Sequence, residues 1–328
     1  MIQSRLYLWP LAIALGIFSA CGQEFTLPPQ PEPQTPPTAG TYNIEKTWDL
    51  NSPTDMVSQG AFLYVIEGNS EVNAYFIEQR QAVRPTFVQP FEGLIEPVQL
   101  AIARRESTFV FVADAGDMQV KRYHFTGGPP RASFTDTSWV EFSGLAADER
   151  LSIYVSDATR DTIFKYRSTG DRDRLISDLG SGTGFVTGPR GLHYDGENLV
   201  VADTNKDWVQ RILTDSTNTA ADGDPIGFDA SLSSPWDVST DRNNASEIYI
   251  ADFGTDRVLK YDVTGALLDS VYSPNKLETQ LAVPIDGPRY ISVEGNQVFV
   301  ADPAENRIVV LLRATDGSSL PPDTTGAP

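Results

Sequence analysis

The chain has little cysteine and little histidine: Cys21 is its single cysteine, and His124 and His193 are its two histidines among 328 residues. One cysteine excludes a disulfide within the chain, and two histidines exclude a zinc site built from three. The sequence also lacks the Gly-Xaa-Ser-Xaa-Gly motif of serine hydrolases. We therefore assign no catalytic residue and no metal ligand, and a non-enzymatic role is favoured without an enzyme being excluded.

Basic residues are scarce as well, because 25 Lys and Arg stand against 44 Asp and Glu, for a formal net charge of −19. Nucleic acids and anionic lipid headgroups are held by clustered Lys and Arg. The charge balance therefore excludes nucleic acid as an expected partner.

No apolar run is long enough for a membrane-spanning helix; the run from Leu6 to Phe18 is short and is interrupted by Pro10. Arg5 precedes it, and this order of a base and then apolar residues predicts an export signal over residues 1–20. The sequence Phe18-Ser19-Ala20-Cys21 resembles the bacterial lipobox, which implies cleavage before Cys21 and acylation of its thiol. An ordinary secretory signal with a cysteine just past the cut is the alternative.

Residues 21–41 are predicted to form a tether, because six prolines fall between Pro28 and Pro37 and favour an extended spacer. An acylated Cys21 would hold the protein on a membrane through its lipid. Gly22 follows the cysteine, and the resemblance to lipoprotein sorting rules then implies the outer membrane of a bacterial envelope.

The rest of the chain repeats one pattern six times: two β-branched or aromatic residues, a residue that is small in five copies, and an acid. The acids lie 43 to 50 residues apart, which is the spacing of propeller blades. The copies are Tyr64–Glu67, Phe111–Asp114, Tyr154–Asp157, Val200–Asp203, Tyr249–Asp252 and Phe299–Asp302.

A proline stands 14 to 17 residues before the acid in five copies, and Phe142 takes its place in the third. Three residues after this position every copy has an apolar residue, and turn formers follow. Each repeat thus predicts an inner strand, a second strand that ends at the acid, a third alternating strand and a less regular fourth. His193 falls on an inner strand and His124 on an outer one.

The sixth repeat runs out of chain after Leu312, before a fourth strand. Residues 42–50 alternate with period two, so we predict that they supply that strand. This closes residues 42–313 into an all-β, six-bladed β-propeller of four-stranded antiparallel blades, because closure removes open sheet edges. Residues 314–328, rich in Ser, Thr, Pro, Gly and Asp, are predicted to be a disordered tail.

The repeats resemble NHL repeats, whose units carry a proline before the first strand, a Tyr-Val-Ala-Asp second strand and an Asn-Arg-Ile or Asp-Arg-Val start of the third. Asp256-Arg257-Val258 and Asn306-Arg307-Ile308 match that last element. The resemblance covers about residues 42–313 and implies a six-bladed propeller that acts as a binding scaffold for proteins or RNA. Some propellers of related shape are lyases or lactonases.

The six acids of the repeat are expected to be structural. A carboxylate at the end of a strand can accept backbone N–H bonds or pair with a base eight positions on, such as Arg122, Lys165, Arg211 or Lys260. The structural acids are Glu67, Asp114, Asp157, Asp203, Asp252 and Asp302.

The residues just after the proline position differ between repeats, and we expect them at the rim of the central channel. Arg190, Trp236 and Arg289 would lie on one arc, where two guanidiniums beside an indole could hold a carboxylate or an aromatic anion. Salt bridges within an acidic rim are the alternative reading. The whole candidate binding set is Arg190, Trp236, Arg289, Tyr290, Asp55 and Asp237.

A calcium ion is the one cofactor that these residues leave open, with Asp55, Gln99 and Asp237 as its oxygen ligands in the channel. We expect a monomeric, lipid-anchored envelope protein whose propeller is a scaffold for a protein or peptide partner. The alternatives are a propeller enzyme of lactonase or lyase type that uses a divalent cation in the channel, and an envelope component without a discrete ligand.

Overall fold

The computed structural model describes residues 42–180, 183–214, 223–226, 231–241, 244–272 and 285–313. All of them belong to one compact unit, Pro33–Pro328. The predicted export signal, Cys21, the rest of the tether and the tail 314–328 lie outside the described residues, so these assignments stay predictions.

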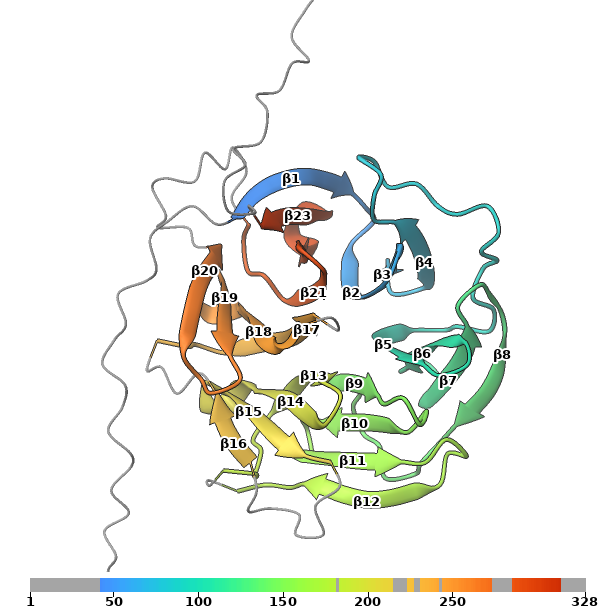
Figure 1. Cartoon of the computed structure of the whole chain (residues 1–328). Helices are drawn as coiled ribbons and strands as arrows, with labels where there is room; N and C mark the ends of the chain where they lie inside the picture. The colour runs from blue at the N-terminus through green and yellow to red at the C-terminus, as the bar shows by residue number, and fades with distance from the viewer. Residues whose placement is uncertain are drawn as a thin grey trace, which may run out of the picture. The chain divides into compact units, whose positions relative to one another are not determined.

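Six antiparallel sheets, the blades, form a ring (Figure 1). Each inner strand contacts the inner strand of the next blade, and that of blade 6 contacts that of blade 1, so the ring is closed. The predicted six-bladed propeller is confirmed. The inner strands are β2 (Pro53–Gln59), β5 (Pro97–Arg104), β9 (Gly144–Ala147), β13 (Pro189–Tyr194), β17 (Pro235–Asp241) and β21 (Tyr290–Glu294).

The repeated pattern forms the second strand of every blade, and its acid is the last residue of that strand. These strands are buried because a blade lies against each of their faces, which explains their unbroken apolar runs. They are β3 (Phe62–Glu67), β6 (Thr108–Asp114), β10 (Ile153–Asp157), β14 (Asn198–Asp203), β18 (Asn244–Asp252) and β22 (Gln297–Asp302).

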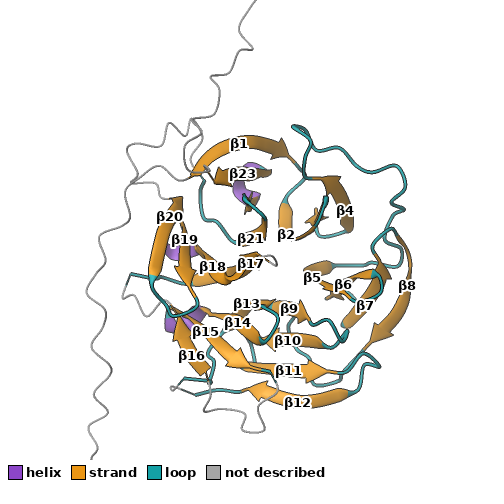
Figure 2. Ribbon diagram, in the orientation of Figure 1, coloured by secondary structure: helices purple, strands orange, loops and turns teal. Residues whose placement is uncertain are grey.

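The third strands begin a few residues after the acids. They are β4 (Glu71–Phe76), β7 (Gln119–His124), β11 (Thr162–Tyr166), β15 (Trp208–Leu213), β19 (Arg257–Asp262) and β23 (Arg307–Arg313). Among the residues that the structure describes, helix is confined to single 3₁₀ turns before the third strands of blades 4 to 6. They are η1 (Thr204–Lys206), η2 (Phe253–Thr255) and η3 (Pro303–Glu305) (Figure 2). In the described part of the chain no helix has the length and apolar character to cross a membrane.

The outer strand of blade 6 comes from the opposite end of the chain. β1 (Tyr42–Asp49) pairs antiparallel with β23, with Trp48 opposite Ile308 and Thr47 opposite Val309. The predicted closure by the N-terminal segment is therefore confirmed. The other outer strands are β8 (Gly127–Phe134), β12 (Arg172–Ser177), β16 (Gly223–Ile226) and β20 (Leu267–Tyr272).

Blade 1 differs from the predicted four strands, because its sheet ends at β4. The chain leaves β4 through residues 77–96, which contain no strand. One backbone bond, from Phe76 N to Val83 O at 3.0 Å, continues the pairing. Pro85 and Pro90 follow, and a residue without an N–H cannot extend a ladder.

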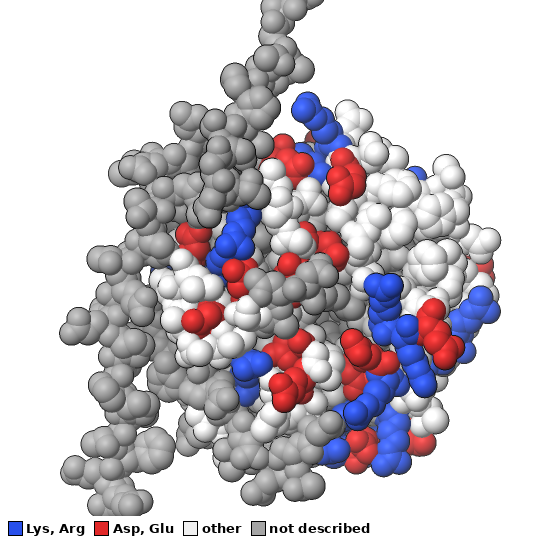
Figure 3. Space-filling view, viewed as in Figure 1, with Lys and Arg blue, Asp and Glu red and all other residues white. Residues whose placement is uncertain are grey.

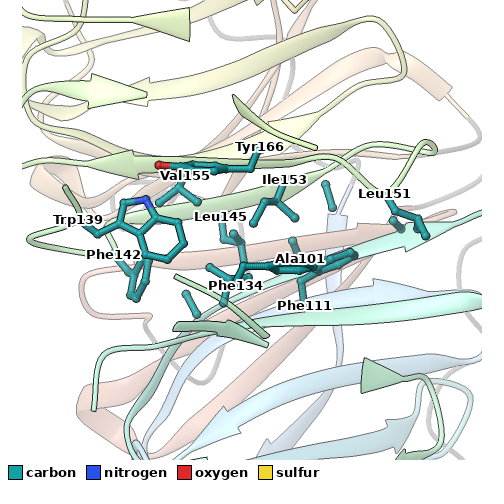
Figure 4. Close-up of a cluster of buried hydrophobic side chains, with 14 residues drawn as sticks. Ala101, Phe111, Phe134, Trp139, Phe142, Leu145, Leu151, Ile153, Val155 and Tyr166 are labelled. Carbon is teal, nitrogen blue, oxygen red and sulfur yellow. The ribbon is translucent and has the colours of Figure 1, made fainter. Parts of the chain in front are cut away.

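The apolar residue three positions after each proline is buried in every blade and packs between neighbouring sheets. The cluster between blades 2 and 3 shows how blade 3 manages without its proline (Figure 4). Phe142 packs edge-on against Trp139 with ring centroids 5.1 Å apart, and Trp139 contacts Tyr166 at 5.2 Å. The aromatic residue thus anchors the start of the inner strand by packing.

Candidate functional site

Five of the six repeat acids tie the chain just before an inner strand to the end of the second strand, whereas Asp302 binds Arg307. Asp114 is fully buried and accepts the backbone N–H groups of Ile95 and Glu96 at 2.8 and 2.7 Å, just before β5. Asp157 accepts the N–H of Val140 at 2.8 Å in the same manner. Comparable bonds reach Asp203 from Thr187, Asp252 from Ser233 and Glu67 from Asn51. These are the contacts of structural carboxylates.

For Asp114 and Asp252 the predicted pairing with a base eight positions on is wrong. Asp114 binds Lys121 at 2.6 Å, seven positions on, and Asp252 binds Arg257, five positions on, also at 2.6 Å. Side chains alternate along a strand, and Lys121 lies opposite Val112 on the face that Asp114 shares. Arg122 lies on the other face, where it stacks on Phe109 and Phe134.

The other three predicted bases meet a second set of acids. These acids stand near the hairpin between the inner and second strands: Lys165 lies 3.9 Å from Asp148, Arg211 2.8 Å from Asp195 and Lys260 3.5 Å from Glu247.

The inner strands approach one another closely two residues after the proline position. A Cβ on Gly144 would lie 2.0 Å from the carbonyl oxygen of Arg190, and one on Gly191 would lie 2.1 Å from Oδ1 of Asp237. Both positions therefore require glycine. The six residues at this level, which we call the channel layer, are Asp55, Gln99, Gly144, Gly191, Asp237 and Tyr290.

Asp55 and Asp237 make equivalent bonds in the channel layer. Asp55 accepts the N–H of Met56 at 2.8 Å and that of Leu100 in the next blade at 2.6 Å. Asp237 accepts the N–H of Val238 at 2.8 Å and that of Ile291 in the next blade at 2.9 Å. Each carboxyl thus joins two inner strands, blade 1 to blade 2 and blade 5 to blade 6.

Burial makes both of these acids hold their protons more tightly than usual. Burial raises the pKa of Asp237 to about 7, and burial together with the negative charge of Asp237 raises the pKa of Asp55. Burial first, and then the charge of Asp55, raises the pKa of the neighbouring Tyr290 to about 12. The channel layer therefore favours neutral carboxyls.

This raised pKa predicts a pH-dependent stability. The folded state keeps a proton on Asp237 that the unfolded chain releases near pH 3.8, so stability should fall as pH rises from about 4 to about 7 and then level off. At about 1.4 kcal/mol for each pKa unit, the loss between about pH 5 and pH 8 should be roughly 2 to 3 kcal/mol. Urea unfolding of wild type and Asp237→Asn across this range measures it, and the Asn variant should give the flatter profile. Equal slopes would contradict the assignment.

A small cavity of ≈ 40 Å³ lies along the axis beside the acids, lined by residues of all six inner strands, Gln99, His193 and Thr240 among them. Such a volume admits water rather than a substrate. It continues into a pocket of ≈ 90 Å³ lined by Arg104, Asp148 and Asp195. In the view of Figure 3, acidic side chains lie around the middle of the ring and basic ones gather over blades 2 and 3.

Within the described ranges, no group of three or more His, Cys, Asp or Glu could hold a metal ion. Of the predicted calcium ligands, Asp55 and Asp237 use both carboxylate oxygens to accept backbone N–H groups. Calcium binding stays a prediction that has not been tested.

Three of the predicted binding residues meet at the rim. The guanidinium carbon of Arg190 lies 4.0 Å from the ring centroid of Trp236, and that of Arg289 lies 4.9 Å from it. Arg289 also lies 4.7 Å from the ring of Phe253, a residue that the sequence did not single out. We call Arg190, Trp236, Phe253 and Arg289 the rim cluster.

The rim cluster retains charge for a ligand. Among the described residues, Arg190 forms an ion pair with one carboxylate, that of Glu141, at 3.8 Å, a distance too long for a hydrogen bond. Arg289 is exposed, and in the part of the chain that the structure describes no carboxylate forms an ion pair with it. The predicted set thus divides into two groups: Asp55, Asp237 and Tyr290 belong to the channel layer, and Arg190, Trp236 and Arg289 to the rim cluster.

No family model matches the sequence, and no curated protein does. Solved structures resemble it in fold. Virginiamycin B lyase from Staphylococcus aureus superposes with a TM-score of 0.57 at 9% identity, covering 83% of this chain and 100% of the lyase. A chain of a nidogen/laminin complex gives 0.54 at 17% identity, covering 78% and 87%. A protein of unknown function from Bacteroides thetaiotaomicron gives 0.58 at 16% identity, covering 85% and 71%. At these identities the likeness shows the β-propeller fold alone.

Proposed function

We propose that this protein is a lipid-anchored component of a bacterial envelope whose propeller binds a protein or peptide partner at the rim cluster. The observation that carries the proposal is that the guanidiniums of Arg190 and Arg289 both lie over the ring of Trp236. In a chain of net charge −19, two weakly paired cations on one aromatic surface mark a local site for an anion. The anchor rests on the lipobox-like sequence that ends at Cys21.

The rim cluster fits an acidic segment with an aromatic or flat apolar side chain. The indole and the Phe253 ring supply apolar area, and each guanidinium can donate two parallel N–H bonds to one carboxylate. Stacking on Trp236 already restricts both arginine side chains, which lowers the entropic cost of binding. Aromatic residues and arginine are also the residue types that dominate binding energy at protein interfaces.

A non-enzymatic role agrees with the geometry of the channel. The acids of the channel layer bind backbone N–H groups, and the cavity beside them holds ≈ 40 Å³. Of the similar structures, one is a lyase and another belongs to a nidogen/laminin complex. At 9% and 17% identity neither one transfers its activity or its partner to this chain.

The test is crosslinking of the anchored protein in its native envelope, followed by identification of what it contacts. The double variant Arg190→Glu, Arg289→Glu should lose at least about tenfold of its affinity for the partner, because two charge-assisted contacts become repulsive. Added salt should weaken the wild-type complex. Arg131→Glu, an exposed arginine on β8, is the matched control and should bind as wild type does. Unchanged partner binding by the double variant would show that the rim cluster is not the binding site.

A further inference from the structure

The outer edge of blade 1 carries main-chain groups that have no partner strand and line a groove, where Val72 and Ala74 are only 4% and 3% exposed. On β4 the N–H groups of Tyr75 and Asn73 point toward β3, because Phe76 N bonds to Val83 on the outer side and directions alternate along an antiparallel strand. The N–H and C=O groups of Val72 and Ala74 therefore point outward. Among residues 42–180 and the other described ranges, no hydrogen bond reaches either of these two N–H groups.

A groove of ≈ 340 Å³ runs along this edge, the largest of the three cavities described here. One wall is β4 from Glu71 to Ala74, and the other is the connection from Arg84 to Phe91. The place beside β4 is where the other five blades have a fourth strand, and Figure 1 shows nothing drawn as a strand outside β4. Exposed Val83 and Phe87 lie on the same connection, with 42% and 51% of their surfaces accessible.

We propose that this edge binds an extended segment of a partner protein, which adds to β4 as an antiparallel fourth strand and places a carboxylate against Arg84. This surface is separate from the rim cluster. Addition of a strand to an open sheet edge is an established mode of peptide recognition, in which main-chain bonds give affinity and side-chain pockets give specificity.

Blade 6 shows that the fourth position accepts a strand from elsewhere. Its outer strand β1 has no direct chain connection to β23, and backbone pairing and side-chain packing hold it there. The same bonds are available to a strand that arrives from another protein.

The charge of the groove selects the occupant. Arg84 is the only base among the lining residues and Glu71 the only acid, so a carboxylate of the occupant is expected beside Arg84 and away from Glu71. The side chain of Arg84 is 56% exposed. It stacks on Tyr75 and lies 3.6 Å from Glu67, which leaves most of its five N–H donors for a ligand. The apolar part of the lining is Val72, Ala74, Val88 and Phe91. An acid flanked by β-branched or small apolar residues fits this combination.

Hydrogen exchange tests the proposal on the full-length protein. The probe is a phage-displayed library of linear peptides, selected on the protein, and the enriched peptides are then synthesised. Bound peptide should slow exchange of the Val72 and Ala74 amides by at least about tenfold, because new main-chain bonds protect them. The Asn73 and Tyr75 amides, already bonded to β3, should not change. Failure to enrich any peptide, or enriched peptides that leave Val72 and Ala74 unprotected, would overturn the proposal.

Two substitutions sharpen the test. Ala74→Pro removes an outward N–H without breaking the β3 ladder, and Arg84→Glu reverses the charge; each should reduce peptide binding at least about tenfold. Arg80→Glu, on the same connection but outside the lining, should not. If Ala74→Pro fails to fold, Arg84→Glu and the wild-type exchange data still decide. If the Val72 and Ala74 amides are already protected from exchange without peptide, a segment of this chain covers the edge. If that protection increases with protein concentration, a second copy covers it. Either result would refute the binding of a partner strand.

Discussion

Deletion of Tyr42–Leu50 should abolish the cooperative thermal unfolding of the propeller. This segment supplies the fourth strand of blade 6 and the side chain of Trp48, which is 1% exposed. Trp48 packs between blades 6 and 1, with ring centroids 6.1 Å from Phe299 and 6.0 Å from Tyr75. Its loss exposes the edge of β23 and this core together. Differential scanning calorimetry and near-ultraviolet circular dichroism measure the outcome.

The single substitution Trp48→Ala is the graded companion of this deletion. It removes the buried indole but keeps the strand, so it should cost about 3 to 5 kcal/mol and retain one cooperative transition. A typical domain has only about 5 to 15 kcal/mol of stability to lose, which is why removing both strand and indole should exceed what the ring tolerates. A truncated protein that melts as the full chain does would show that the ring does not depend on β1.

The second large effect is expected at the repeat acids. Asp252→Ala should lower the free energy of unfolding by about 3 to 5 kcal/mol, because the fully buried carboxylate holds Arg257 at 2.6 Å and the N–H of Ser233 at 2.7 Å. Both groups would be left without that partner. The same variant should bind any partner with unchanged affinity, since Asp252 lies inside the blade. Chemical denaturation and a binding titration measure the two quantities.

Glu106→Ala is the control, because Glu106 is exposed at the hairpin of blade 2 and should change stability by less than about 0.5 kcal/mol. An Asp252→Ala protein as stable as wild type would remove the structural role of the acid. Weakened partner binding at unchanged stability would point to a binding role instead.

The starts and ends of the strands could be predicted from the sequence, because they depend on burial and backbone geometry within each repeat. Prolines mark the start of inner strands at Pro53, Pro97, Pro189 and Pro235, and the acids mark the ends of second strands. Closure by residues 42–50 could also be predicted, since one repeat lacked an outer strand and one spare alternating segment existed.

The absence of a fourth strand from blade 1 could not be predicted in the same way. The period of the repeat is similar in all units, and only Pro85 and Pro90 signal that residues 77–96 do not pair. The partner of Asp114 was mispredicted by one residue, because a shift of one position moves a side chain to the opposite face of a sheet. The partner of Asp114 depends on the register between β6 and β7, which could not be predicted from the sequence.

The division of the candidate site has a similar cause. Adjacent residues such as Trp236 and Asp237 point in different directions, so one joins the rim cluster and the other the channel layer. The electrostatic interaction of Asp55 with Asp237 depends on the closed ring, because the ring brings the inner strands of blades 1 and 5 to a common axis. Phe253 joins the rim from the turn after an acid, and its aromatic character next to Asp252 was the available signal.

The most direct test of the ring is a disulfide between its two ends. Thr47 and Val309 lie opposite each other on β1 and β23. Because Leu50 N donates to the carbonyl oxygen of Asn306, the residue just before β23, the alternation makes Thr47 and Val309 a non-hydrogen-bonded pair, the closer kind. In the full chain with Cys21→Ser, the variant Thr47→Cys, Val309→Cys should oxidise in the folded state. Its thermal midpoint should then rise, since a bond that closes almost the whole propeller lowers the entropy of the unfolded chain by the equivalent of about 5 to 6 kcal/mol. Two thiols that stay free in the folded protein under oxidising conditions would contradict the closed ring.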